Sequence, residues 1–563
     1  MIQQKTIKLR PPEIVMQPRR MGAIWASRIS FARQLVLRVQ RGQWRVERAK
    51  WELDDDGRGE VIYRVQTPQQ AFHFVLFSTK LAEDERTDRV IAERWDAAAA
   101  LCEGEMSEVR LAQLRANVPK QEYGRADHET LVWTRGNRSS RFFNHVVDCL
   151  AAGRQPDVDL LAQGGYIFRS TAYYANTKFG LRAYDAIGDD HPLAGTFQAQ
   201  MLAAWLFREY AVDLAEHIAA TKSSDAVKLA RPIRRFLGIG NATGMGLVPF
   251  VVNNPQVTHA WCWVRETAVS QIKHHHATQA DATKLRRLLA HCQTYFGEDL
   301  TETKGLFTEQ AVLIRDLQVL EKWVAEWIEA GTINGRLTSQ PWQTLCEAAY
   351  GNIDIESEEL LHTLLMECYP DLCDALLPQL EKPHLAELDP TMTLERLQAV
   401  AQESYGWALS SRLLEPKSRQ LFWYFSVDSE EPLIGVRGKD AGENVERPFD
   451  IPHQVANMLN DLTRCPLDET VGYFLLLHPQ HRLIAHRVQA LHGMDYAESH
   501  SNLVDADYIP LYHQRFQLAM YGMERFSPQS IYWVRVTLLQ GAPTAQDVAE
   551  GWDDEWVFPL KPK

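Results

Sequence analysis

The sequence predicts an α+β protein that is predominantly helical and contains more than one domain. The chain has 563 residues, and a single hydrophobic core stops growing at roughly 250 to 300 residues. Strand-like runs occur near both ends, and helical spacing of apolar residues dominates between them. We therefore expect an α+β domain with an antiparallel meander over 1–125, a helical domain carrying the functional site over 126–395, and a mixed α/β region over 396–563.

The N-terminal part combines an early helix with three strands. Residues 31–40 have helical spacing, and Ser30 stands where a helix cap is favoured. Strand patterns separated by turn residues follow over 44–53, 61–65 and 72–77. Short consecutive strands favour an antiparallel meander. Two later stretches, 87–102 and 108–116, are predicted to be helical.

The middle of the chain is predicted to be mostly helical from about residue 133 to residue 394. The apolar spacing indicates helices over 142–150, 193–220, 226–237, 257–272, 282–295, 309–330 and 356–368. The second of these is apolar on nearly all sides, which is typical of a helix enclosed by others. In the C-terminal region, helices are predicted over 454–462 and 468–477, and the strand-like runs 421–427 and 531–539 are candidates to pair with each other.

The amino-acid composition argues against nucleic acid and membranes as binding partners. The net charge is −13, so the long-range field repels nucleic acid. No apolar run approaches the roughly 20 residues that a membrane-spanning helix needs, and the N-terminus lacks the apolar core of a signal peptide. The eight cysteines are dispersed, without the spacing of a zinc or redox motif. We expect a soluble, cytoplasmic protein with no membrane or nucleic-acid partner, and leave a homo-oligomer open.

The stretch 238–246 is the most unusual in the sequence, with four glycines and the polar residues Asn241 and Thr243. We interpret it as a turn between two helices whose backbone amides, with Gly240 and Gly244, approach an anion that Arg231, Arg234 or Arg235 neutralises. It fits neither the dinucleotide-binding fingerprint nor the P-loop. The alternative is a packing turn in which glycine merely makes room.

A second candidate segment, 164–180, concentrates hydrogen-bond donors between glycines. Arginine, lysine and hydroxyl groups together suit recognition of a carboxylate or phosphate. We expect substrate contacts from Arg169, Ser170, Thr171 and Asn176, and proton transfer from Tyr173 or Lys178. A polar surface loop is the alternative.

For two other polar clusters, a structural role is favoured over a role in ligand binding. Residues 134–143 contain Arg135, Arg138 and Arg141 around a helix start that Ser139 or Ser140 caps. Binding of an anion at this helix start is the alternative. Glu209, Asp213 and His217 share one face of the enclosed helix, where ion pairing with Arg169, Arg234 or Lys178 from neighbouring segments is favoured over metal binding. Glu209 is kept as a candidate proton-transfer group.

Histidine patterns do not predict a metal site. The E-x-x-H pair Glu359 and His362 has no second half on the enclosed helix, and His478, His481 and His486 are interpreted as lying at a helix start.

The leading hypothesis is an enzyme acting on a small carboxylate- or phosphate-bearing metabolite, its reaction class and cofactors unknown. Tyr173, Lys178 and Glu209 are the expected catalytic groups. A noncatalytic helical scaffold or regulatory interaction protein is the alternative, and a nucleotide- or flavin-binding protein is the third.

Overall fold

The computed structural model describes residues 8–82, 94–120, 129–170, 190–244, 251, 254–298, 306–330, 341–381, 385–415, 425–426, 432–433, 451–500, 510–529, 533–552 and 556–563. The chain divides into two compact units, each assembled from three segments. The first unit contains Met1–Ile24, Gly244–Lys273 and Asp371–Gln517, and the second contains Trp25–Thr243, His274–Pro370 and Leu518–Lys563. The three consecutive domains expected from the sequence stay a prediction.

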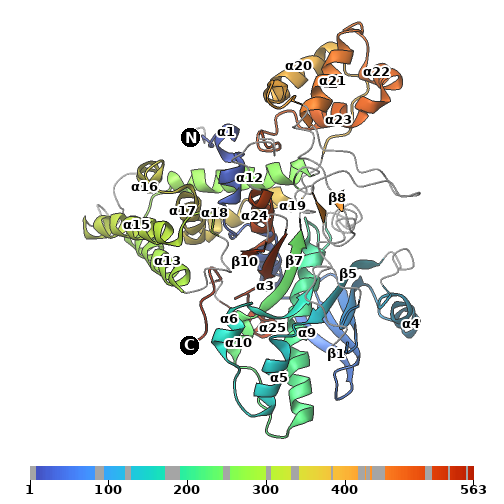
Figure 1. The fold of residues 1–563 in the computed structure, drawn as a ribbon, viewed down its shortest axis with the longest axis vertical. Helices are drawn as coiled ribbons and strands as arrows, with labels where there is room; N and C mark the ends of the chain where they lie inside the picture. The colour runs from blue at the N-terminus through green and yellow to red at the C-terminus, as the bar shows by residue number, and fades with distance from the viewer. Residues whose placement is uncertain are drawn as a thin grey trace. The chain divides into compact units, whose positions relative to one another are not determined.

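Within the described ranges, a nine-stranded sheet forms the centre of the second unit, in the order β1-β2-β3-β4-β5-β6-β7-β11-β10 (Figure 1). The strands are β1 (Arg45–Leu53), β2 (Gly59–Gln66), β3 (Ala71–Ser78), β4 (Ala97–Glu103), β5 (Thr130–Arg138), β6 (Tyr166–Ser170), β7 (Gly238–Gly244), β10 (Met523–Pro528) and β11 (Trp533–Leu538). Strands β1 to β6 pair antiparallel in sequence order, whereas β6 and β7 are parallel. The mixed α+β class and the N-terminal meander are thus confirmed.

Helices cover the two faces of the meander. Side chains of β2 to β5 on one face, including Val75 and Ala100, pack with Leu111 and Leu114 of α4 (Glu108–Asn117). Phe74 alternates with Val75 and points to the other face, where its ring lies 6.2 Å from that of Phe207. Phe207 belongs to α9 (Gln198–Lys222), which contacts β4, β5 and β6. The helix that the sequence predicts to be enclosed is therefore α9, which packs against the middle strands of the sheet.

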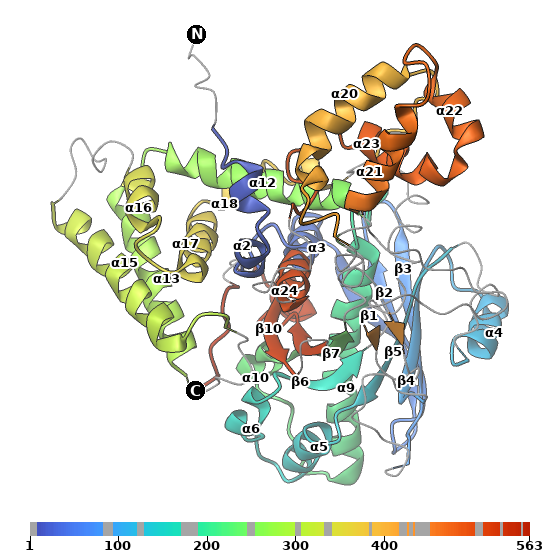
Figure 2. The same ribbon diagram turned by 45° about the horizontal axis from the view of Figure 1, so that its top comes forward.

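A second group of helices in this unit comprises α13 (Gln279–Gly297), α15 (Gln310–Ala330), α16 (Pro341–Ala349) and α17 (Ile355–Cys368), which contact one another (Figure 2). Shorter helices are α3 (Phe31–Arg41), α5 (Phe143–Ala151), α6 (Val158–Ala162), α10 (Arg231–Phe236) and α25 (Ala545–Ala549). A capping box formed by Thr278 and Asp281 fixes the start of α13. Most helices predicted in the middle of the chain are present within a few residues of their expected ends.

The helix predicted over 87–102 is wrong in the part that the structure describes, because Ala97–Glu103 is strand β4. The four alanines from Ala97 to Ala100 favour a helix intrinsically. In the structure they are buried and pair with strands on both sides. Tertiary pairing in the middle of a sheet overrides the local preference.

Three further expectations about strands are corrected. Residues 134–138 belong to strand β5, not to the approach to a helix, although Ser139 Oγ still accepts from the Phe142 amide before α5. The glycine-rich stretch is not a turn between helices but begins with strand β7. In the described parts of the strand-like runs 531–539 and 421–427, the expected pairing is absent: β11 lies between β7 and β10, whereas β8 (Phe425–Ser426) pairs with β9 (Pro432–Leu433).

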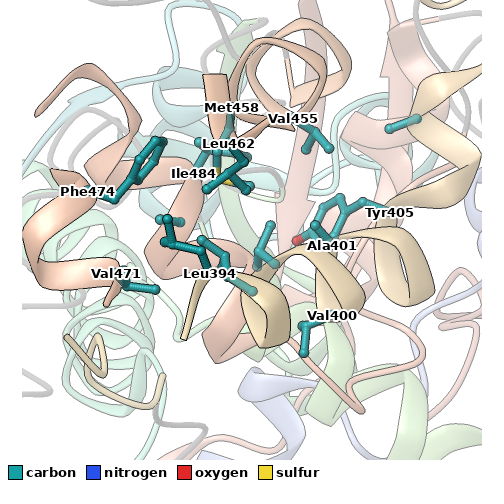
Figure 3. Packing of buried hydrophobic residues seen from close by; sticks show 14 of the residues in the cluster. Leu394, Val400, Ala401, Tyr405, Val455, Met458, Leu462, Val471, Phe474 and Ile484 are labelled. Carbon is teal, nitrogen blue, oxygen red and sulfur yellow. The ribbon is translucent and has the colours of Figure 1, made fainter. Parts of the chain in front are cut away.

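The first unit is mainly helical where it is described. Its helices are α1 (Pro12–Val15), α2 (Pro18–Gly22), α12 (Pro255–Lys273), α19 (Pro378–Glu381), α20 (Leu394–Tyr405), η3 (Gly406–Leu409), α21 (Ile451–Leu462), α22 (Val471–Leu477), η5 (Pro479–His481) and α23 (Arg482–Ala490). Two further helices, α18 (Pro370–Asp374) and α24 (Pro510–Tyr521), each include residues of both units. Helices α20 to α23 enclose a buried cluster that includes Leu394, Met458 and Phe474 (Figure 3). Among the described helices, none has the length and apolar character needed to cross a membrane.

Candidate anion-binding cavity

A cavity of about 860 Å³ lies within the second unit. It is lined by α10, by one face of α13, by Glu367 in the last turn of α17 with Pro370 after it, and by α25 with the C-terminal segment. This volume is within the range of roughly 300 to 1,000 Å³ that is typical of small-molecule sites. The cavity is therefore large enough for a metabolite-sized ligand.

Helix α10 supplies Arg231 and Arg235 to the lining. Pro232 stands in the first turn, where its missing amide hydrogen costs no helical hydrogen bond. Arg231 pairs with Asp547 at 2.5 Å and with Glu550 at 2.6 Å. Arg235 donates to the main-chain oxygen of Gly541, and its guanidinium lies 5.7 Å from the centre of the Trp552 ring.

Helix α13 supplies Lys284, Arg287 and His291. Their spacing of i, i+3 and i+7 places them on one face of the helix. Lys284 Nζ donates to the main-chain oxygen of Cys368 at 3.3 Å. His291 Nε2 lies 2.8 Å from the main-chain oxygen of Phe558 and 3.1 Å from that of Val557. Because those carbonyls only accept, Nε2 carries the hydrogen in the neutral ring and Nδ1 keeps its lone pair.

Cationic groups outnumber carboxylates around the cavity. Among the described residues, its lining includes five arginines or lysines (Arg28, Arg231, Arg235, Lys284 and Arg287) and three carboxylates (Glu367, Asp547 and Glu550). The carboxylates already have ion-pair partners, since Arg231 holds two and Arg33 contacts Glu367 at 3.0 Å. The local balance favours an anion over a metal ion.

Asp547 of α25 and Glu550, which follows this helix, are held in their charged form. Burial tends to raise the pKa of Asp547, but hydrogen bonds from Thr544 and Arg231 outweigh it and leave that pKa below its ordinary value. Hydrogen bonds from Gln546 and Arg231 lower the pKa of Glu550. Both groups therefore fix Arg231 at the cavity wall near neutral pH.

Two tryptophans give the cavity an aromatic wall. Trp552 and Trp556 are 8% and 3% exposed. Trp556 Nε1 donates to the main-chain oxygen of Gln540 at 2.8 Å, and Arg33 lies 5.1 Å from the centre of its ring. Such contacts hold the C-terminal segment in place.

Four of the residues predicted from the sequence come together at another place in this unit. Arg169 and Ser170 lie at the carboxyl end of β6, beside Gly240 and Asn241 of the parallel strand β7. Asn241 is 2% exposed, and its Nδ2 donates to the main-chain oxygen of Ser170. Asn241 Oδ1 has no hydrogen-bond partner among the described residues. Carboxyl ends of adjacent parallel strands commonly frame ligand sites. Arg169, Ser170, Gly240 and Asn241 are neighbours at such an edge, and their role in binding stays a prediction.

Most of the other predicted site residues have no described side chain. Thr171, Tyr173, Asn176 and Lys178 lie outside the described residues, as does the side chain of Thr243. Gly244 ends strand β7. Among the described residues, the cavity lining shares only Arg231 and Arg235 with the residues that the sequence analysis connected with a ligand.

Glu209 lies in an ion-pair cluster on α9. Arg234 contacts Glu209 at 3.0 Å and Asp213 at 2.7 Å, which is the ion pairing expected from the sequence. Tyr63 donates its hydroxyl hydrogen to Asp213 at 2.7 Å. Burial, and then the negative charge of Asp213, raise the pKa of Tyr63 well above its ordinary value. His217 instead accepts from Trp51 Nε1 at 3.2 Å. A catalytic role for Glu209 stays a prediction.

Sequence reasoning found only part of the cavity. Arg231 and Arg235 were identified as anion partners, but for the glycine-rich segment and not for a cavity wall. The cationic face of α13 was missed, although the spacing of Lys284, Arg287 and His291 was a readable signal. The approach of α25 and the C-terminal segment is a long-range feature with no local signal.

Comparison of the chain with protein-family models, with curated proteins and with solved structures gives no match. The geometry of the second unit is therefore the basis for a functional proposal.

Proposed function

We propose that the second unit binds a small anionic molecule, bearing phosphate or carboxylate groups, in the cavity between α10, α13 and α25. The observation that carries this proposal is the surplus of cationic side chains around an 860 Å³ cavity in a chain of net charge −13. A cavity with low-dielectric walls and one dominant sign of charge concentrates ligands of the opposite sign.

The proposed ligand belongs to the same class that the sequence predicts. Its proposed binding residues, however, are on α10 and α13 and not in the segments 164–180 and 238–246. Guanidinium groups pair with phosphate or carboxylate oxygens in two parallel hydrogen bonds. The Trp552 and Trp556 wall supplies apolar surface for the rest of the ligand. Histidine is the side chain that most often serves as a general acid or base, so His291 is the candidate proton-transfer group in the lining, with its Nδ1 lone pair as the base.

The test is isothermal titration calorimetry with inorganic pyrophosphate and citrate, which represent the two anion classes. Lys284→Gln and Arg287→Gln each remove one charge from the cavity wall. A charge-assisted hydrogen bond is worth about 1.5 to 3 kcal/mol, so we expect each variant to weaken binding by about tenfold or more.

Arg286→Gln is the matched control. Arg286 is the neighbour of Arg287 on α13, but it is half exposed and pairs with Glu321 at 3.2 Å outside the cavity. We expect Arg286→Gln to leave the affinity unchanged within about twofold. If neither anion binds the native protein, or if Arg286→Gln weakens binding as much as Arg287→Gln, the proposal is wrong and the noncatalytic scaffold becomes the better hypothesis.

A further inference from the structure

A three-residue cluster in the first unit has the geometry of a metal site. Asp461, His478 and His481 each offer one ligand atom, and these atoms all lie within 4.8 Å of one another. His481 Nε2 lies 2.9 Å from Asp461 Oδ2, and His478 Nδ1 lies 3.8 Å from the same oxygen. Four ligands around Zn²⁺ at bond lengths of about 2.0 to 2.2 Å are separated from one another by about 3.4 Å. The separations here bracket that value, so small side-chain rotations are enough to bring the three atoms onto one ion.

The fold holds these three residues in place. Asp461 is in the last turn of α21, His478 follows α22 directly, and His481 ends the 3-10 turn η5 before α23. The helix start expected at these histidines is therefore present at α23, and the same region places His478 and His481 near Asp461. The Phe474 ring packs 4.8 Å from the ring of His478 and is nearly parallel to that of His481 at 5.7 Å.

Phe474 belongs to the buried cluster enclosed by α20 to α23 (Figure 3). The two imidazoles thus stand against a packed core, which limits their rotation before any ligand binds.

The cluster also leaves one face open. Asp461 is 21% exposed and His478 is 29% exposed, whereas His481 is 6% exposed. An ion can therefore reach the site from solvent, and water can occupy a fourth position. Arg464 approaches the other carboxylate oxygen, Asp461 Oδ1, at 3.5 Å. This leaves Oδ2 directed at the two histidines.

We propose that Asp461, His478 and His481 form a binding site for a divalent transition-metal ion of the zinc type, with ligand atoms Oδ2, Nδ1 and Nε2. Two neutral imidazoles and one carboxylate match the nitrogen and oxygen donors that Zn²⁺ accepts, and three protein ligands leave one position for water. Binding displaces the proton that His481 and Asp461 share in the hydrogen bond between them. This site lies in the other unit from the anion cavity and does not depend on it.

The experiment uses the full-length protein, freed of metal by dialysis against a chelator and titrated with Zn²⁺ in competition with a colorimetric chelator. We expect His478→Gln and Asp461→Asn each to weaken one binding event by at least about tenfold, the lower end of the cost of losing even a supporting partner of a metal ligand. His478 and Asp461 are partly exposed, so neither change opens the core.

His486→Gln is the matched control, because His486 is on α23 and its Nε2 contacts the main-chain oxygen of Ala386 instead of the cluster. It must retain the full stoichiometry of the native protein. The chain has 19 histidines and eight cysteines, so the decisive quantity is the difference between variants and not the total zinc bound.

Co²⁺ provides the second readout. Visible absorption typical of a low-symmetry site, present in the native protein and in His486→Gln but lost in His478→Gln, supports the proposal. Equal Zn²⁺ affinity and stoichiometry in the native protein, His478→Gln and Asp461→Asn overturn it. Circular dichroism of each variant confirms that the comparison is made between folded proteins.

Discussion

Arg208 illustrates how a single buried side chain joins distant parts of the second unit. It is 1% exposed and donates from α9 to main-chain oxygens of Arg235 and Ala542, both at 2.8 Å, and of Pro543 at 3.1 Å. Burial lowers its pKa to about 10, so the guanidinium stays charged at neutral pH. The side chain thus satisfies carbonyl groups at the end of α10 and in the loop before α25, next to the anion cavity.

We predict that Arg208→Ala lowers the free energy of unfolding by about 3 kcal/mol or more, because several buried carbonyls lose their donor at once. Arg208→Lys restores only part of this loss, since an ammonium group cannot reproduce the fork of a guanidinium. Urea unfolding followed by circular dichroism measures both effects.

Arg58→Ala serves as the comparison for Arg208. Arg58 is half exposed and pairs at 3.6 Å with Asp56, which is also exposed. Its removal is expected to change stability by less than about 1 kcal/mol. Equal destabilisation by Arg58→Ala and Arg208→Ala contradicts the role given to Arg208.

At the scale of residues, the sequence predicted chemistry better than location. The pairing of Arg234 with Glu209 and Asp213 was expected, because charges on an enclosed helix need partners. Nothing in the local sequence indicates that Arg208 of the same helix reaches the loop at Ala542. Contacts across more than 300 residues depend on the assembled fold.

Strand β7 shows why an element can be misread from its composition. Glycines at 238 and 240 suggested a ligand-binding turn, but both positions are tightly packed. A Cβ at Gly238 would meet the main-chain oxygen of Leu538 and lie 2.8 Å from the main-chain nitrogen of Gln540, and a Cβ at Gly240 would lie 2.6 Å from the Tyr166 ring. These glycines allow the strands on either side of β7 to approach.

Gly238→Ala is therefore expected to lower the free energy of unfolding by about 1 to 3 kcal/mol, the usual cost of overpacking a core. The backbone of Gln540 cannot move aside as the end of a flexible side chain can. Thermal unfolding of the variant, compared with the native protein, measures the effect.

The matched control for this element is Gly297→Ala in the last turn of α13, where nothing lies within 4 Å of an added Cβ. Since alanine restricts the unfolded chain and favours a helix, this change is expected to be neutral or stabilising by up to about 1 kcal/mol. An unfolding temperature for Gly238→Ala at or above that of Gly297→Ala contradicts the packing role of Gly238.

Helices and strands also differ in how well the sequence predicts them. The helices α12, α13, α15 and α17 agree with their predicted spans because the apolar spacing is a local signal. Strand β4 was misassigned because its alanines favour a helix, and β11 was given the wrong partner because pairing is not encoded locally. Long-range pairing is thus the part of this fold that the sequence pattern does not determine.

At the scale of the whole molecule, the charge distribution is expected to favour binding of a small anion over binding of an extended polyanion. The chain carries a net charge of −13, while the cavity lining has more cationic than anionic side chains. At an ionic strength of about 0.15 M, the field of exposed charges decays over about 8 Å. A small anion inside the cavity is therefore governed mainly by the cavity wall, whereas a polyanion that extends beyond it meets the acidic surface.

We predict that inorganic pyrophosphate binds the native protein and that a short single-stranded oligonucleotide, at the same concentration of phosphate groups, does not displace it. Competition calorimetry at about 0.15 M salt makes the comparison, and Arg287→Gln, which is expected to bind pyrophosphate at least about tenfold more weakly than the native protein, serves as the control. The expectation follows from repulsion of the extended polyanion by the rest of the molecule. Displacement by the oligonucleotide at an equal or lower concentration would show instead that the cationic wall belongs to a nucleic-acid surface. That result would contradict the exclusion of nucleic acid drawn from net charge, because a local patch would then have overcome the field of the whole chain.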